Sequence, residues 1–257
     1  MKKQQKQQEV LDLDSFNDVS LFQMIPSGTG MGLSHLKTIV DSVHNGRSKL
    51  NSLLITGSAG LQIHASAFIR ALGISDYNQI DSSLLLSPSG LHPLFCQGSY
   101  QAFIISNCDK LVPVVHTPIY HVLTKQQFGL YNYQTQGPDI FPVSGLVILT
   151  TRNSKKVSGP ILQSVQHIVR LEDYTKEQLE LIILQRLKYA NIDYENEYIL
   201  QDIVRYGKNN LKQCIRFLKC CVAVMQSQGR QKLNVEDVIK SARLNRLNDL
   251  GDDDIPF

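Results

Sequence analysis

Residues 52–70 read SLLITGSAGLQIHASAFIR, and this stretch decides the fold. The apolar run at residues 53–56 predicts a short buried strand, the loop Gly57-Ser58-Ala59-Gly60 follows it, and a helix-like segment comes next. Strand, glycine loop and helix form the frame of a phosphate-binding loop, in which backbone N–H groups and the helix N-terminus hold phosphates. The stretch therefore predicts a fold of the nucleotide-binding type.

The side chains that such a loop needs are missing. Against the pattern G-x-x-x-x-G-K-[ST], Gly57 is the first glycine, Gln62 replaces the second, Ile63 replaces the lysine and His64 replaces the hydroxyl residue. Isoleucine cannot neutralise phosphate charge, and a neutral imidazole is a poor ligand for a magnesium ion, which prefers oxygen. Two interpretations remain open: a nucleotide-binding domain that has lost its chemistry, with Gly60 as a remnant, or a doubly wound domain that never bound nucleotide.

Composition places the chain among ordinary globular proteins. The chain has 257 residues, of which 42% are hydrophobic and 19% charged, which favours a packed core over disorder. No apolar run reaches the roughly 18 residues of a membrane helix, and no apolar segment follows the basic N-terminus, so we expect no membrane span, no signal peptide and a cytoplasmic location. Five cysteines without framework spacing predict reduced thiols and no metal site, with Cys108, Cys214 and Cys221 in the core.

The order of apolar patterns predicts an α/β domain followed by a smaller helical one. We expect four segments: a flexible N-terminal arm, an α/β domain with a parallel sheet, an all-helical domain and an acidic tail, at residues 1–20, 21–172, 173–246 and 247–257. In the first domain we expect strands at 53–56, 79–86, 102–106 and 146–149, a hairpin within 128–142, and helices at 33–43, capped by Ser34, and 117–127. In the second we expect helices at 175–190, 195–205, 209–226 and 234–246, with a capping box at Thr175 and a cap at Asn234.

The sequence of one segment narrows the choice of protein family further. Residues 145–183, GLVILTTRNSKKVSGPILQSVQHIVRLEDYTKEQLELII, resemble the sensor-1 and arginine-finger region of the RuvB family, the AAA+ motors of Holliday-junction branch migration. The similarity runs from about Leu21 to Leu244 and is strongest at residues 149–152 and 160–171. It implies an AAA+ parallel-sheet domain with a helical lid, and residues 128–145 take the place of the family's pre-sensor hairpin. We expect no counterpart of the family's winged-helix domain.

Carried over position by position, the resemblance implies that the ATPase machinery is gone. The acidic pair that ends the Walker B strand falls on Ser106 and Asn107, the arginine finger on Leu162 and the sensor-2 arginine on Asn210, whereas sensor 1 survives as Thr150 and Thr151. Phosphoryl transfer depends on charge stabilisation, and loss of a finger alone costs on the order of 10³-fold in rate. The resemblance thus predicts no catalytic residue, no bound cofactor and no ATP hydrolysis.

The C-terminal residues carry a second resemblance. The sequence DDDIPF resembles the tip of bacterial single-stranded DNA-binding protein (SSB), which docks replication and repair enzymes. It comprises Asp252, Asp253, Asp254, Ile255, Pro256 and Phe257. A phenylalanine ring suits an apolar pocket, its carboxylate suits a basic residue, and the aspartates attract a basic rim. The alternative is an acidic tail that keeps the protein in solution.

A basic stripe is predicted in the helical domain. Its members are spaced 3, 4, 4 and 3 residues apart, so they would share one face, opposite the apolar face, wherever the segment is helical; they are Arg205, Lys208, Lys212, Arg216 and Lys219. Three interpretations of such a stripe remain open. It contacts DNA phosphates, it is a solvated helix face, or it contacts the chain's own acidic tail.

These inferences lead to one functional prediction and two alternatives. We expect an inactive RuvB-like AAA+ protein that serves as an adaptor or structural subunit in DNA replication, recombination or repair. Its expected partners are SSB-docking enzymes, with an AAA+ protein and DNA as further candidates. The first alternative is a non-hydrolysing subunit of a clamp-loader-like or helicase-loader assembly, and the second is a weak DNA-stimulated ATPase with non-standard ligands.

Overall fold

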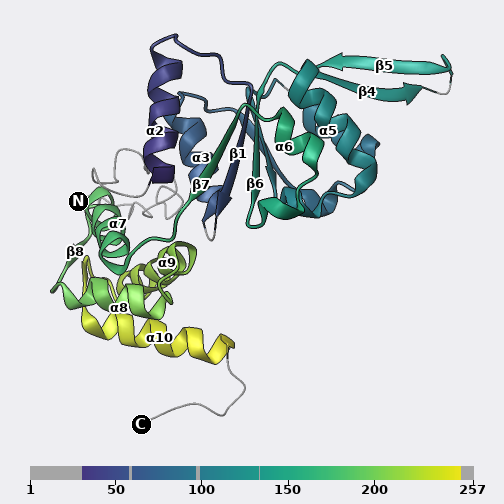
Figure 1. The fold of residues 1–257 in the computed structure, drawn as a ribbon. Coiled ribbons are helices and arrows are strands. Elements are labelled where there is room, and N and C mark those ends of the chain that lie inside the picture. Colours follow the sequence, from purple (N-terminus) through teal and green to yellow (C-terminus); the bar gives the residue numbers. More distant parts are fainter. Residues whose placement is uncertain (1–30, 58–59, 97–98, 133, 250–257) are drawn as a thin grey trace, which may run out of the picture. The chain divides into compact units, whose positions relative to one another are not determined.

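A computed structural model describes residues 31–57, 60–96, 99–132 and 134–249. The predicted arm at residues 1–20 and the DDDIPF tip lie outside these residues. Contacts separate the chain between Asp173 and Tyr174 into two compact units, one beginning at Ser20 and the other containing the C-terminal helices. We call them the α/β unit and the helical unit and describe each by itself (Figure 1).

The α/β unit is built on a five-stranded parallel sheet, as the sequence predicts. Its strand order is β2-β3-β6-β1-β7. The strands are β1 (Ser52–Gly57), β2 (Tyr77–Asp81), β3 (Ala102–Ser106), β6 (Leu146–Thr151) and β7 (His167–Leu171). Every residue of β3 and β6 is buried, because continuous apolar runs fit strands that are covered on both faces. Since β1 lies between β6 and the edge strand β7, Gly57 at its end lies beside the C-terminal ends of both strands.

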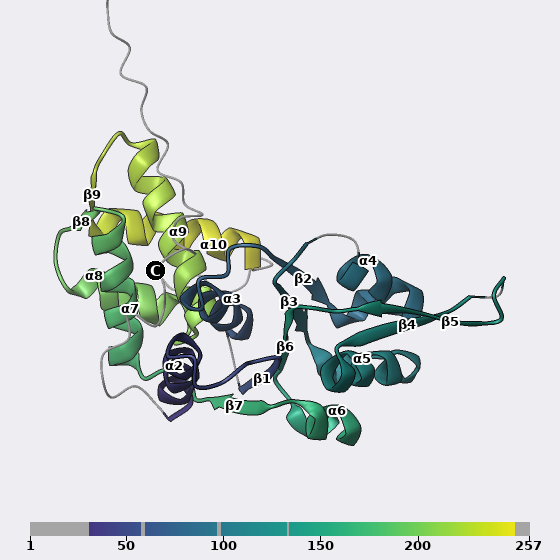
Figure 2. The ribbon, with the colours of Figure 1, turned by 90° about the horizontal axis from the view of Figure 1, so that it is seen from above.

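Helices cover both faces of this sheet (Figures 1 and 2). On one face α2 (Met31–His44) and α3 (Leu61–Ala71) pack on an apolar cluster that includes β1 and β7 residues. On the other face a second cluster lies beneath α4 (Leu91–Cys96), α5 (Pro113–Lys125) and α6 (Gly159–Ser164). Helices α3 and α6 therefore lie on opposite faces of the sheet.

A β-hairpin extends from the α/β unit, as the sequence predicts (Figure 1). Its antiparallel strands are β4 (Gln127–Asn132) and β5 (Gly137–Pro142). Tyr131 and Ile140 are both more than half exposed on it, at 58% and 60%. Phe128 anchors its base because its ring is fully buried in the cluster beneath α5.

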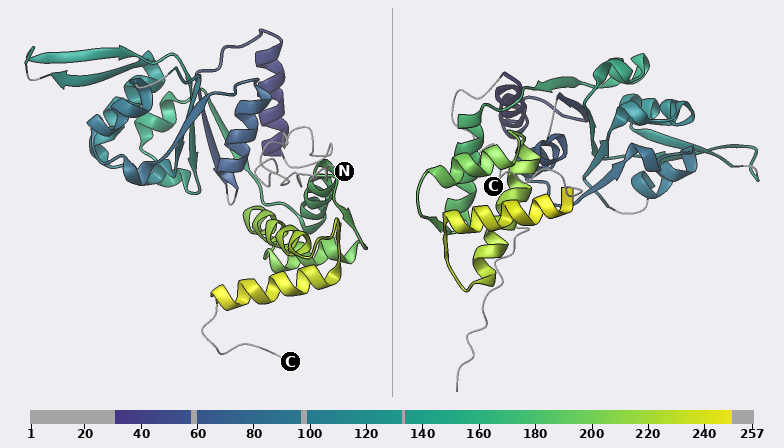
Figure 3. Two further views of the ribbon diagram at one scale, coloured as in Figure 1. Left: turned by 180° about the vertical axis from the view of Figure 1, so that it is seen from behind. Right: turned by 90° about the horizontal axis from the view of Figure 1, so that it is seen from below.

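Among the described residues of the helical unit, 174–249, there are four helices, and Figure 3 shows them from two sides. They are α7 (Lys176–Tyr189), α8 (Tyr198–Tyr206), α9 (Leu211–Ser227) and α10 (Val235–Asp249), with the short parallel strands β8 (Asp193–Tyr194) and β9 (Lys232–Leu233). The predicted capping box at Thr175 is confirmed, because its hydroxyl accepts from the Gln178 N–H and the Gln178 side chain accepts from the Thr175 N–H. The predicted Asn234 cap is confirmed by its bond from the Asp237 N–H.

Several predicted boundaries are wrong for local reasons. Strand β2 ends at Asp81 and not at residue 86, because the Asp81 carboxylate accepts from the Ser83 N–H and starts a 3-10 turn. Helix α5 begins at Pro113 and not at residue 117, since proline is well suited to the first helical position. Ser34 lies inside α2 and is not its cap.

Other segments were not predicted at all or were given to the wrong element. Strand β7 and the short helices α4 and α6 were missed. Residues 247–249, predicted as part of the tail, are helical and complete α10. The predicted burial of Cys108, Cys214 and Cys221 is confirmed.

Candidate functional site

The loop after β1 keeps its glycine geometry. Gly57 has φ 149°, and a Cβ there would lie 2.3 Å from the Leu171 carbonyl oxygen. Gly60, with φ 76°, precedes the first turn of α3 in the left-handed region. Both conformations favour glycine, so the backbone requires glycine at these two positions. Ser58 and Ala59 lie outside the described residues.

The first turn of α3 offers no charge to a phosphate. The Ile63 side chain is half-buried, and His64 is 1% exposed with Nδ1 2.7 Å from the Gly60 carbonyl oxygen. Since a carbonyl can only accept, Nδ1 carries the proton. Burial lowers the pKa of His64 from 6.5 to about 4, against the raising effect of the Gly60 contact. At neutral pH the imidazole is therefore uncharged and is committed to the loop backbone.

This buried imidazole predicts acid sensitivity of the α/β unit. The unfolded chain binds the proton below pH 6.5 and the folded chain only near pH 4, so stability is complete above pH 6.5 and falls as the pH drops toward 4. We expect His64 to account for a loss of about 2 kcal/mol between pH 7 and pH 5. Denaturant unfolding of wild type and His64→Gln at both pH values measures this, and the variant should lose less stability on acidification. An equal loss in both proteins would show that His64 does not carry the effect.

Hydrogen bonds join the polar residues at the ends of β2 and β3. Ser106 is 1% exposed, and its hydroxyl accepts from Gln62 Nε2 at 3.0 Å. Asn107 has φ 55°, and its Nδ2 donates to Asp81 Oδ2 at 2.5 Å. Hydrogen bonds from Ser83, and to a lesser extent from Asn107, lower the pKa of Asp81. The two positions that align with the acidic pair thus carry no charge and bond to side chains of the same unit.

The hydroxyl of Thr151, at the position predicted as sensor 1, also forms hydrogen bonds within the α/β unit. Thr151 is fully buried at the end of β6, and its Oγ1 donates to Asp109 Oδ1 at 2.6 Å. The same oxygen accepts from the Asn153 N–H at 3.0 Å. Thr151 therefore links the end of β6 to the 3-10 turn that follows β3.

The two positions aligned with arginines have structural roles in this chain. Leu162 in α6 is half-buried and packs against the apolar cluster beneath α4, α5 and α6. Asn210 is the N-cap of α9, and its side-chain oxygen accepts from the Gln213 N–H at 3.3 Å. An apolar contact and a helix cap explain both residues without a ligand.

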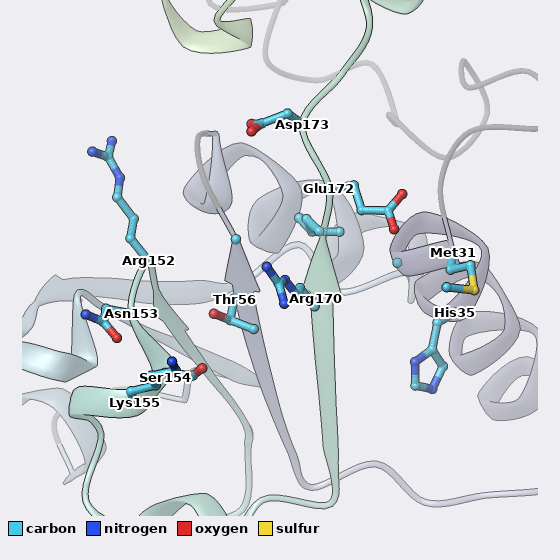
Figure 4. Close-up of a pocket in the computed structure, with 13 residues that line it drawn as sticks. Met31, His35, Thr56, Arg152, Asn153, Ser154, Lys155, Arg170, Glu172 and Asp173 are labelled. Carbon is cyan, nitrogen blue, oxygen red and sulfur yellow. The ribbon is translucent and has the colours of Figure 1, made fainter.

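Next to Gly57 the sheet edge holds a cavity of about 880 Å³ that the sequence did not predict. Its cations are Arg152 and Lys155, from the segment after β6, and Arg170 on β7; the carboxylates of Glu172 and Asp173 line the same cavity (Figure 4). Its other lining residues are Met31, Gly32, His35, Thr56, Gly57, Asn153, Ser154 and Leu171. The mixed charges suit a polar ligand. Within the described ranges no three metal-ligating side chains gather.

The predicted basic stripe is interrupted. Helix α8 ends at Tyr206, and Lys208 and Asn209 both have φ near 50°, so the chain turns before α9 begins. Arg205 forms an ion pair with Asp202 at 2.8 Å. Only Lys212, Arg216 and Lys219 share one helix, α9. The break falls between the two predicted helices, and α9 carries three of the five members of the stripe.

Solved structures resemble this fold over most of the chain. A substituted form of Thermotoga maritima RuvB superposes with a TM-score of 0.70 at 17% identity, over 91% of this chain and 75% of that one. The structure titled as the Thermotoga maritima RuvB Holliday junction branch migration motor gives 0.64 at 18% identity, over 89% and 73%. The fold is RuvB-like and of the AAA+ type. Identity this low establishes the fold alone. No family model and no curated protein matches the sequence.

The AAA+ fold that the sequence resemblance implied is thereby confirmed, including the hairpin and the helical unit after the sheet. Gly57 ends β1 and Gly60 precedes α3, while Ser106 and Thr151 end β3 and β6, which are adjacent strands of the sheet. No helix in the described part of the chain is long and apolar enough to span a membrane.

Proposed function

We propose that this chain is an inactive RuvB-like AAA+ protein that acts as an adaptor or structural subunit in DNA replication, recombination or repair. One observation carries the proposal: Gln62 Nε2 bonds to Ser106 Oγ between the start of α3 and the end of β3. In an active AAA+ site these two elements face the phosphates and the magnesium ion. In this chain the neutral side chains of Gln62 and Ser106 form a hydrogen bond with each other between these two elements.

The remaining positions support the same proposal. Thr151 bonds to Asp109, and His64 is buried and neutral. Two carboxylates at Ser106 and Asn107 would repel each other and lose solvation unless a metal ion compensated them, so neutral residues suit a site without magnesium. Isothermal titration with Mg-ATP tests this directly, and we expect no binding in the low-micromolar range.

A DNA-contacting role rests on the charge of the helical unit. Residues 205–246 contain ten Lys and Arg residues and two acidic residues, Glu236 and Asp237. Asp237 is fully buried and accepts from both terminal nitrogens of Arg230, so this pair neutralises itself. Lys212 and Arg216 lie exposed on α9, where phosphates can reach them. RuvB, the Holliday junction branch migration motor among the similar solved structures, agrees with a DNA context.

We predict that Lys212→Ala and Arg216→Ala each weaken binding to single-stranded DNA about equally for all sequences. Each lost phosphate contact should lower the slope of log K against log salt by about 1. Fluorescence anisotropy at several salt concentrations measures both quantities. Lys188→Ala is the matched control, because Lys188 is an exposed cation on α7. DNA binding that does not weaken with salt would contradict a phosphate-contacting role.

A second candidate function is a weak ATPase with unusual ligands. The cavity beside Gly57 favours it, since Arg152, Lys155 and Arg170 supply cations close to the retained loop glycines. In a weak ATPase these three cations would have to replace the charges that the loop lacks. Substituting them would then abolish ATP hydrolysis, whereas an inactive adaptor shows no hydrolysis to lose.

A further inference from the structure

Arg186 is the largest fully buried side chain of the described residues, and it lies in the last turn of α7. The other buried positions of α7 are apolar; they are Leu179, Ile182, Ile183 and Leu187. These positions and Arg186 are spaced three and four residues apart, so they form one stripe, and α7 packs against α8 and α9. Arg186 therefore occupies a core position at which the helical pattern predicts an apolar residue.

The guanidinium of Arg186 is buried, and no hydrogen-bond partner for it lies within the described part of the chain. Nε, Nη1 and Nη2 all lack one among the described residues, and the side chain is 1% exposed. Arg230 in the same unit is paired with a carboxylate, because both carboxylate oxygens of Asp237 accept hydrogen bonds from it. Burial lowers the pKa of Arg186 to about 10, so the group still carries its charge at neutral pH.

A buried charge with no counter-charge is strongly unfavourable, whereas an apolar side chain of similar length is not. Methionine at this position would fill the space at no electrostatic cost. The presence of arginine is explained if its five N–H donors meet an acceptor in another state of the protein. A planar guanidinium pairs best with the two oxygens of a carboxylate or phosphate.

We propose that Arg186 is the receptor of an oxyanion-binding site in the helical unit, beside the last turn of α7, for a carboxylate or phosphate group. Because the side chain is sealed from solvent, the last turn of α7 must open to admit the anion and close around it. This site is separate from the cavity beside Gly57, which lies in the α/β unit. The inference does not depend on the proposed adaptor function.

The experiment compares the full-length chain in inorganic phosphate and in chloride at equal ionic strength. The readouts are the thermal unfolding midpoint and amide hydrogen exchange across α7, which reports on this unit alone. The variants are Arg186→Met and, as a matched control, Arg243→Met, since Arg243 is an exposed arginine on α10. Arg186→Gln is a second neutral variant that replaces the first if methionine prevents folding.

Phosphate should raise the wild-type midpoint by about 3 °C or more and slow exchange in α7. Arg243→Met should respond like wild type. Arg186→Met should be more stable than wild type in chloride and should not respond to phosphate. An equal phosphate response in all three proteins would overturn the proposal.

A further variant distinguishes a free anion from a carboxylate of the chain itself. This triple variant carries Asp252→Asn, Asp253→Asn and Asp254→Asn. If phosphate has no effect on wild type but these changes lower its midpoint and leave Arg186→Met unchanged, the oxyanion belongs to the chain's own acidic tail. If neither phosphate nor the asparagine changes act through Arg186, the proposed site does not exist.

Discussion

Purified full-length protein is expected to release phosphate from Mg-ATP at the background rate, with or without branched DNA. The loss of an arginine finger alone costs about 10³-fold or more, and under the proposed function Leu162, Ile63 and Asn210 stand where an active motor has three cations. Under the same proposal, the neutral Ser106 and Asn107 stand where an active motor has its acidic pair, so a magnesium site is expected to be missing too. We therefore expect a rate at least 10³-fold below that of an active AAA+ motor, measured by a coupled phosphate-release assay.

A partial restoration should leave this result unchanged. Ile63→Lys combined with His64→Thr returns the lysine and hydroxyl of the loop, but it leaves the Gln62–Ser106 hydrogen bond and two neutral strand ends. Charge stabilisation needs the metal as well as the lysine, so the double variant should stay at background. Its folded state is checked by circular dichroism.

A measured turnover would point to the second candidate function, and two substitutions would identify its origin. Arg152→Ala and Arg170→Ala remove cations from the cavity beside Gly57. If wild type hydrolyses ATP and either change abolishes hydrolysis, the chain is an ATPase with non-standard ligands and the inactive adaptor is wrong. Gly60→Val serves as a loop control, because a β-branched residue is strained at φ 76°.

The fold was predictable where long apolar patterns exist and not elsewhere. Strands β3 and β6 are continuous apolar runs, and the glycines at 57 and 60 mark the loop after β1. Strand β7 was missed because it lies at the sheet edge, where exposed Ile168 and Arg170 alternate with buried Val169 and Leu171 over only five residues. Helix α6 spans six residues, which is too short for a helical period to be recognised.

The candidate site could be predicted from the sequence only in part. The sequence identifies which charged residues are missing, because each can be compared with a known pattern. It does not identify what fills their place, since Gln62 and Ser106 are 44 residues apart and Thr151 and Asp109 are 42 apart. Only the strand order brings these pairs together. The sequence predicts the break between residues 205 and 209, but not the left-handed backbone of Lys208 and Asn209 that makes the turn.

Deleting Phe257 is expected to remove docking of SSB-binding replication or repair enzymes almost completely. Under the proposed function the ring enters an apolar pocket, and a buried aromatic anchor of this kind commonly contributes enough that its loss weakens binding about 30-fold or more. The deletion also moves the C-terminal carboxylate onto Pro256, one residue from its expected basic partner. Affinity purification with full-length and Phe257-deleted bait, followed by titration of each captured enzyme, measures the change.

Two further variants separate the contributions of the tip. One glycine appended after Phe257 keeps the ring but displaces the carboxylate, so it should weaken binding strongly if terminal capture is the mode of recognition. Asp253→Asn keeps both groups and removes one steering charge, so it should slow association modestly at low salt and have little effect at high salt. Equal recovery of every enzyme with wild-type and Phe257-deleted bait would contradict docking through this tip. The folded body would then have to recruit its partners through its own surfaces, of which the hairpin with exposed Tyr131 and Ile140 is the first to test.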